Sequence, residues 1–185
     1  YEEQEVTNMK FDRVNYCPAC RTKLNDKQIE GRMRRYCQQC EQPIYQNPKP
    51  CAGVLVIDDC ERVLLIKRTE PPAPGAWSVP AGYLEADEPP RHAEVRELRE
   101  ETNLTLTKHG LRLLDTVFVR HPNGQYVLVI VYSASSSNTT GTVISGSDAA
   151  DARFWDLSEL QQSDERVEPR YDAVFEQAVD TMRQP

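Results

Sequence analysis

Short runs of apolar and β-branched residues recur along the chain and predict strands. Residues 52–57 and 62–67 form two such runs, and the charged tetrapeptide 58–61 between them predicts a β-hairpin. Runs of the same kind, which predict further strands, occupy residues 111–119, 126–134 and 153–155.

Helical periodicity occurs in two places. Pro89 and Pro90 suit the first turn of a helix, where a missing N–H costs nothing, and they predict a helix over residues 91–102. Residues 171–182 carry apolar side chains at helical spacing and predict a second helix. The segment 133–147 is rich in Ser, Thr and Gly, which predicts a mobile loop. Strands that alternate with helices predict a compact α/β domain.

The predicted helix at 91–102 carries an acidic face. At about 100° per residue, Glu97, Glu100 and Glu101 fall on one narrow face that should point outward. Such closely packed carboxylates repel one another, and a hard divalent cation such as Mg²⁺ or Mn²⁺ would offset the repulsion. A charge run of this kind is also typical of a solvated helix face. The residues predicted to face the core are Val95, Leu98 and Thr102.

Four cysteines form two C-x2-C pairs. Cys17 and Cys20 are separated by sixteen residues from the second pair, Cys37 and Cys40, a spacing typical of a four-thiolate zinc site. Because protein ligands would fill all four positions, this zinc should be structural. Two disulfides are the alternative, but a reducing compartment disfavours them, and a module of about thirty residues has too small a core to fold without a metal.

Composition and charge limit the remaining possibilities. The chain has 185 residues, of which 39% are hydrophobic and 28% charged, as in a globular protein. We expect a cytoplasmic protein, because neither a membrane helix nor a signal peptide is apparent. The net charge of −7 disfavours binding to nucleic acid, although residues 10–40 hold eight Lys or Arg against three Asp or Glu. The predicted organisation is a tail at 1–12, a zinc ribbon at 13–45 and the α/β domain at 46–185.

The acidic helix and the loop before it resemble the signature of the Nudix hydrolases. One position departs from that signature: Asn103 replaces the usual glycine, and we expect it to end the helix in the left-handed conformation. The matching positions are Gly82, Glu88, Arg96, Glu97, Leu98, Glu100, Glu101 and Leu104.

The resemblance implies a fold and a subgroup. The fold is the Nudix α/β/α sandwich with a mixed sheet, here preceded by a small N-terminal zinc ribbon. Residues 44–49 and 77–85, and more weakly 148–155, are similar to a ribbon-bearing group that acts on ADP-ribose and FAD. The S-Q-P-W-P segment of NADH pyrophosphatases is absent, since Val119-Arg120-His121-Pro122 stands in its place.

The resemblance also implies roles for the residues of the site. Magnesium or manganese would be bound by Glu97, Glu101 and Glu100, with the backbone carbonyl of Ala81 as a further ligand. Arg96 would hold a neighbouring carboxylate through a forked hydrogen bond, and Gly82 would let the loop approach the metal. Glu88 either belongs to the site or is a plain carboxylate at the start of the helix.

The resemblance leaves the general base and the substrate contacts open. A base from outside the signature would come from the acidic segment that contains Asp148 and Asp151, which is otherwise a solvated loop. Trp77, Tyr83 and Tyr126 could stack on a nucleotide base, but aromatic residues in a sheet protein more often belong to its core.

The expected activity is hydrolysis of a diphosphate that links a nucleoside to another group. ADP-ribose is the first choice, giving AMP and ribose 5-phosphate, and FAD or NADH are alternatives. A second possibility is a nucleotide sensor whose basic ribbon binds RNA or a protein. We expect a nucleotide-derived small molecule as the main partner and, from the family, a homodimer.

Overall fold

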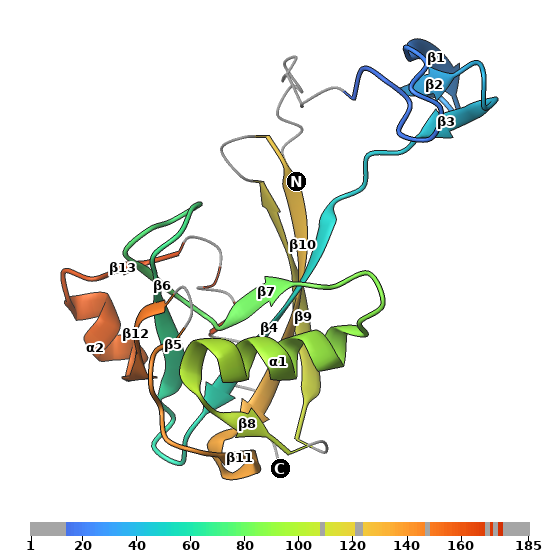
Figure 1. Cartoon of the computed structure of the whole chain (residues 1–185). Coiled ribbons are helices and arrows are strands. Elements are labelled where there is room, and N and C mark those ends of the chain that lie inside the picture. The colour runs from blue at the N-terminus through green and yellow to red at the C-terminus, as the bar shows by residue number, and fades with distance from the viewer. Residues whose placement is uncertain are drawn as a thin grey trace. The chain divides into compact units, whose positions relative to one another are not determined.

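The computed structural model describes residues 14–107, 110–120, 124–146, 149–168, 171 and 174–175. The predicted tail at 1–12 lies outside these residues. The chain forms two compact units, the smaller made of residues 1–48 with 120–126 and the larger of residues 49–119 with 127–185 (Figure 1). In the part of the chain that the structure describes, no helix is both long and apolar enough to cross a membrane.

The smaller unit contains a three-stranded antiparallel sheet. Its strands are β1 (Asn25–Ile29), β2 (Arg32–Cys37) and β3 (Gln42–Ile44), in the order β1-β2-β3. The buried apolar cluster of this unit is small, and two of its members are cysteines. Its buried residues are Cys17, Leu24 and Cys37, with Cys40 and Ile44 packed against them.

The larger unit is built on an eight-stranded mixed sheet. Its main order is β13-β6-β5-β4-β10-β9, with β12 paired to β5 and β7 paired to β4. The pairs β4–β10 and β6–β13 are parallel, whereas β4–β5 is the predicted antiparallel hairpin. The strands are β4 (Lys49–Ile57), β5 (Val63–Arg68), β6 (Ala76–Ser78), β7 (Ala81–Tyr83), β9 (Arg112–Arg120), β10 (Tyr126–Ser135), β12 (Ala149–Trp155) and β13 (Arg166–Val167).

Both faces of this sheet are covered, because the central strand β4 is buried on both sides. Leu55 and Ile57 belong to one hydrophobic cluster, and the alternate residues Val54 and Val56 belong to the other. Helix α1 (Pro90–Thr102) contributes to the second cluster, while α2 (Leu157–Gln162) contributes Leu160 to the first. Figure 1 shows α1 lying across the sheet. The predicted α/β/α sandwich with a mixed sheet is therefore confirmed.

Helix α1 ends where the sequence predicts. Pro90 opens the helix, and Asn103 closes it in the left-handed conformation with a φ of 60°. The Asn103 N–H donates to the Arg99 carbonyl, and its side-chain amide donates to the carbonyl of Thr142. Asn103 therefore caps the helix as glycine commonly does.

Two predicted segments differ from the structure. The segment predicted as a mobile loop continues β10 to Ser135 and then forms the 3-10 helix η1 (Ser136–Asn138) and strand β11 (Thr139–Thr140), which pairs with β8 (Thr105–Leu106). Pairing with a strand distant in sequence gives residues 139–140 regular structure, whereas residues 141–146 form neither helix nor strand. The strand predicted at 153–155 begins at Ala149, because β5 pairs along it as far as Arg68.

The predicted C-terminal helix lies mostly outside the described residues. Tyr171, Val174 and Phe175 are described, and all three are buried in the cluster that contains Leu160. The Phe175 N–H donates to the Tyr171 carbonyl, the spacing of one α-helical turn.

Candidate active site

The α1 carboxylates differ in their exposure. Glu100 is exposed and Glu97 is half-buried, but Glu101 is only 2% exposed. The prediction of three outward-facing carboxylates is therefore wrong for Glu101. Strand β7 packs over this part of the helix, and the Ala81 N–H donates to Glu101 Oε2 at 2.9 Å, which gives the buried carboxylate a hydrogen bond in place of water.

Gly82 lets β7 approach α1 closely. A Cβ at this position would collide with the carboxylate of Glu97. The signature glycine is therefore required for a steric reason, since any larger residue would displace either Glu97 or the strand. The atoms that a Cβ at Gly82 would meet belong to a carboxylate of the same site.

Arg96 holds three of the carboxylates together. It forms the expected forked pair with Glu88, from Nε to Oε1 at 3.0 Å and from Nη2 to Oε2 at 2.7 Å. Its Nη1 donates to Glu97 Oε1 at 2.6 Å and to Glu100 Oε2 at 3.2 Å, and Nη2 also donates to the Tyr83 carbonyl. The hydrogen bonds to Glu88 raise the pKa of Arg96 above its usual range, and those from Arg96 lower the pKa of Glu88.

The structure describes only one of the two residues proposed as general base. Asp148 lies outside the described residues. Asp151 is on β12, where it accepts from the Ala152 N–H and lies 3.7 Å from Arg153 Nε. Among the described residues, no hydrogen bond or ion pair joins Asp151 to an α1 carboxylate. The segment before β12 does contact α1, because the Gly146 N–H donates to the Glu101 carbonyl at 3.1 Å.

The aromatic residues proposed to bind substrate lie in different environments. Trp77 has no exposed surface, and its indole N–H donates to Glu165 at 3.0 Å. A buried ring cannot stack on a substrate, so this prediction is wrong for Trp77. Tyr83 directly follows Gly82 and is 44% exposed, with Lys49 Nζ 5.1 Å from its ring centroid. Tyr126 opens β10 and is half-buried.

Two residues near the site were missed by the sequence analysis. Lys49 places a positive charge beside Tyr83, and no periodicity or spacing singled it out. Glu94 is fully buried on α1, and within the described part of the chain neither of its carboxylate oxygens has a hydrogen-bond partner. Burial raises the pKa of Glu94 to about 8. Its position on a strongly charged helix gave no sign of this burial.

The four predicted zinc ligands converge in the smaller unit. The Sγ atoms of Cys17, Cys20, Cys37 and Cys40 lie within 4.8 Å of one another. The distances are 3.9 Å between Cys17 and Cys40 and 3.4 Å between Cys20 and Cys37, and all four are free thiols. Tetrahedral zinc with bonds of about 2.3 Å requires sulfur–sulfur distances of about 3.8 Å. The cluster therefore fits a tetrahedral ion.

The surroundings of the cluster also suit thiolate ligands. Each C-x2-C pair is followed by a residue with a positive φ, 62° at Arg21 and 52° at Glu41, so the two turns match. Hydrogen bonds with Thr22 lower the pKa of Cys20 to about 6. Among described Asp, Glu, His and Cys side chains, only these four form a group of three or more that converges this closely. The α1 carboxylates form a more open arrangement.

Comparison with known proteins points to one family. The model of the NUDIX domain matches residues 47–177. An ADP-ribose pyrophosphatase of Methanocaldococcus jannaschii is 34% identical over 105 residues, which cover 57% of this chain and 60% of that protein. An NAD-capped RNA hydrolase of Pseudomonas aeruginosa is 26% identical over 146 residues, which cover 78% of this chain and 49% of that protein.

The solved structures agree on the fold. The crystal structure of a MutT NUDIX hydrolase from Burkholderia pseudomallei superposes with a TM-score of 0.63 at 25% identity. The match covers 71% of this chain and 98% of that one.

Proposed function

The chain belongs to the NUDIX domain family, and we propose that it is a metal-dependent hydrolase of nucleoside diphosphates linked to another group. The proposed substrate is ADP-ribose, which would give AMP and ribose 5-phosphate. The observation that carries the proposal is the convergence of β7 and α1: Ala81 bonds Glu101, Gly82 packs on Glu97, and Arg96 holds Glu97 and Glu100.

The residues that would hold magnesium or manganese are Glu97, Glu100, Glu101 and the Ala81 carbonyl. Their oxygens are the ligands that hard divalent cations prefer, and the three carboxylates carry more than enough negative charge to offset that of such an ion. When bound, the ion supplies electrostatic stabilisation of the diphosphate and lowers the pKa of a coordinated water. Glu101 is positioned for this by its buried bond to Ala81, because a carboxylate fixed in this way has few alternative rotamers.

Arg96 and Glu88 would act as positioning residues. Arg96 cannot lose its proton, and its Nε and Nη2 already donate hydrogen bonds to Glu88. Its role would therefore be to orient Glu97 and Glu100, with no part in proton transfer. Lys49 and Tyr83 would bind substrate, the ring by stacking on a base and the ammonium group by contact with phosphate. Asp148 and Asp151 remain the residues proposed as general base.

The four cysteines would bind one structural zinc. Protein thiolates fill all four positions, so no coordination site is left open for a substrate. The small core of this unit supports the same role, because few apolar residues are available to stabilise it. Free thiols also suit a reducing compartment, and we propose that the protein works in the cytoplasm. From the family resemblance, we also propose that it forms a homodimer.

Product analysis identifies the substrate. The purified zinc-loaded protein with Mg²⁺ is incubated with ADP-ribose, FAD, NADH, diadenosine polyphosphates and nucleoside triphosphates, and products are separated by chromatography. The proposal predicts cleavage of ADP-ribose to AMP and ribose 5-phosphate with the highest kcat/KM. Faster cleavage of FAD or NADH would support the proposed diphosphate hydrolysis but would show that ADP-ribose is not the preferred substrate. No cleavage of any compound by folded protein would favour the nucleotide-sensor alternative.

A second candidate substrate is NAD-capped RNA. The described part of the smaller unit, residues 14–48, has six Lys or Arg against three Asp or Glu, and Tyr45 is 53% exposed beside Arg34. Exposed aromatic rings next to cations are typical of surfaces that bind single strands. Adding a short NAD-capped RNA to the substrate panel tests this candidate. It is supported only if the capped RNA is cleaved with a higher kcat/KM than NAD alone.

A further inference from the structure

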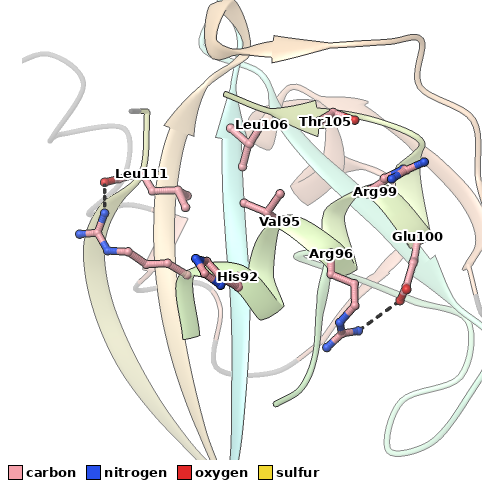
Figure 2. Close-up of a pocket in the computed structure, with 9 residues that line it drawn as sticks. His92, Val95, Arg96, Arg99, Glu100, Thr105, Leu106 and Leu111 are labelled. Atoms are coloured by element: carbon pink, nitrogen blue, oxygen red, sulfur yellow. Dashed lines mark hydrogen bonds and ion pairs between the residues drawn. The ribbon is translucent and has the colours of Figure 1, made fainter. Parts of the chain in front are cut away.

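A pocket of about 960 Å³ lies beside α1, β8 and the start of β9 (Figure 2). Most of its lining comes from α1, and Thr105, Leu106 and Leu111 close it from the other side. The lining residues are Arg91, His92, Val95, Arg96, Arg99, Glu100, Thr105, Leu106 and Leu111.

The pocket and the carboxylate site lie mainly on different sides of α1. At about 100° per residue, Val95 and Arg99 each point about 160° away from Glu97. Neither Glu97 nor Glu101 lines the pocket, and Arg96 and Glu100 are the residues that belong to both regions. The pocket therefore adjoins the proposed metal site and shares Arg96 and Glu100 with it, but Glu97 and Glu101 lie outside the pocket.

Part of the pocket wall is apolar. Leu106 and Leu111 are buried members of a hydrophobic cluster, and Val95 packs against the same cluster. Figure 2 shows Val95 and Leu106 close to each other in the middle of the pocket. An apolar surface of this kind favours a ligand that contains a flat aromatic ring or another apolar group.

The rest of the wall is cationic. The lining contains three arginines against one carboxylate, Glu100, in a chain whose net charge is −7. Arg96 is occupied by Glu88, Glu97 and Glu100, and Arg91 donates to the Leu111 carbonyl at 3.4 Å. Within the described residues, the side chains of Arg99 and His92 have no hydrogen bond or ion pair. Both are exposed and available to an anion.

We propose that this pocket binds a phosphomonoester that also contains an aromatic ring system, as a nucleoside monophosphate does. The base would rest on Val95, Leu106 and Leu111, and the phosphate would contact Arg99 and His92. The apolar wall and the unpaired polar side chains are both required, because an acidic protein attracts a phosphate only where positive charge is concentrated, and Arg99 supplies such charge here. Binding at this site does not depend on the proposed hydrolysis.

Histidine NMR tests the proposal directly. The zinc-loaded 185-residue chain, without magnesium, is titrated with AMP, and the imidazole signals are followed by ¹H–¹⁵N correlation. The chain has three histidines, so His92→Gln identifies the His92 signal. The expected result is a saturable shift of this signal, with at least tenfold weaker affinity for inorganic phosphate and for adenosine.

Two variants separate this pocket from the carboxylate site. Arg99→Gln should weaken the AMP-dependent shift at least tenfold, whereas Arg112→Gln, a control at an exposed arginine outside the pocket, should leave it unchanged. Glu97→Gln should keep the shift even though it disables the proposed hydrolysis. The proposal is overturned if AMP leaves the His92 signal unmoved, if Arg99→Gln binds as tightly as the wild type, or if Glu97→Gln loses the shift.

Discussion

Gly82 and Arg96 fix the Glu97 carboxylate from two sides. Gly82 leaves room for it, and Arg96 Nη1 donates to its Oε1 at 2.6 Å. Neither residue needs to touch substrate for its loss to matter, because a displacement of about 1 Å in a catalytic group can cost about 100-fold in rate.

Replacing Gly82 tests the steric half of this arrangement. We expect Gly82→Ala to lower kcat for ADP-ribose by about 100-fold, because the new methyl group occupies the position of the Glu97 carboxylate. Initial rates together with thermal unfolding check this. The control is Gly31→Ala in the smaller unit, where a Cβ meets no atom within 4 Å and only the positive φ is strained. Full activity of a folded Gly82→Ala protein would contradict the prediction.

Replacing Arg96 tests the electrostatic half. Arg96→Lys keeps the charge but cannot bridge Glu88, Glu97 and Glu100 at once, so we expect kcat to fall by about 10- to 100-fold. The apparent magnesium affinity should weaken in the same variant. Wild-type kcat and wild-type magnesium dependence in Arg96→Lys would show that the guanidinium bridge between the three carboxylates is dispensable.

Some single-residue roles were predictable from the sequence. The ending of the helix at Asn103 follows from the left-handed conformation that Asn tolerates, whereas the roles of Gly82 and Arg96 were implied by the resemblance to the Nudix signature. The structure contains all three contacts. The burial of Trp77 and Glu101 was not predictable in this way. It depends on which strands cover them, and that is a tertiary property.

Helix α1 carries an uncompensated buried carboxylate at Glu94. The folded-state pKa is raised from 4.5 to about 8, so the folded protein holds a proton that the unfolded chain releases. The wild type should therefore lose stability as pH rises from about 4.5 to about 8, with no further loss from this group above that range.

Neutralising Glu94 should remove this pH dependence. We expect Glu94→Gln to raise the free energy of unfolding relative to wild type by about 1–3 kcal/mol at pH 9, and by much less at pH 5. Urea unfolding at both pH values measures the difference. Glu159→Gln, an exposed control on α2, should show no such dependence. If the free energies of unfolding of wild type and Glu94→Gln differ by the same amount at both pH values, the Glu94 carboxyl does not titrate in a buried site.

Elements with strong local signals were predicted well. The β4–β5 hairpin, α1, β9 and β10 follow from apolar runs, turn residues and a proline start, and their bounds differ from the prediction by a few residues. Within the 133–147 segment, β11 was not predicted, because it owes its structure to pairing with β8 and the Ser- and Thr-rich sequence carries no sign of that partner. The extension of β12 likewise depends on β5.

The whole chain divides into units with separate cores. The smaller unit has a cluster built around cysteines, and the larger has two extensive clusters on the faces of its sheet. The first should therefore depend on its metal, whereas the second has enough buried apolar surface to fold without one.

Removing one thiol tests that division. We expect the wild type to contain one zinc per chain by mass spectrometry, and Cys20→Ser to lose most of it. Hydrogen exchange in the variant should show lost protection in β1–β3 and retained protection in β4, β5 and β10. Cys60→Ser, a control at an exposed cysteine outside the cluster, should keep its zinc. Undiminished zinc in Cys20→Ser would contradict the assignment.

Magnesium-dependent hydrolysis by the α1 carboxylates is most directly tested by comparing wild type, Glu101→Gln and Glu159→Gln with ADP-ribose. The predicted result is wild-type turnover that stops when magnesium is withheld, a fall in kcat of at least about 100-fold in Glu101→Gln, and a rate within twofold of wild type in Glu159→Gln. Thermal unfolding of each variant confirms that it is folded. Retained turnover in a folded Glu101→Gln protein would contradict the central role of this carboxylate.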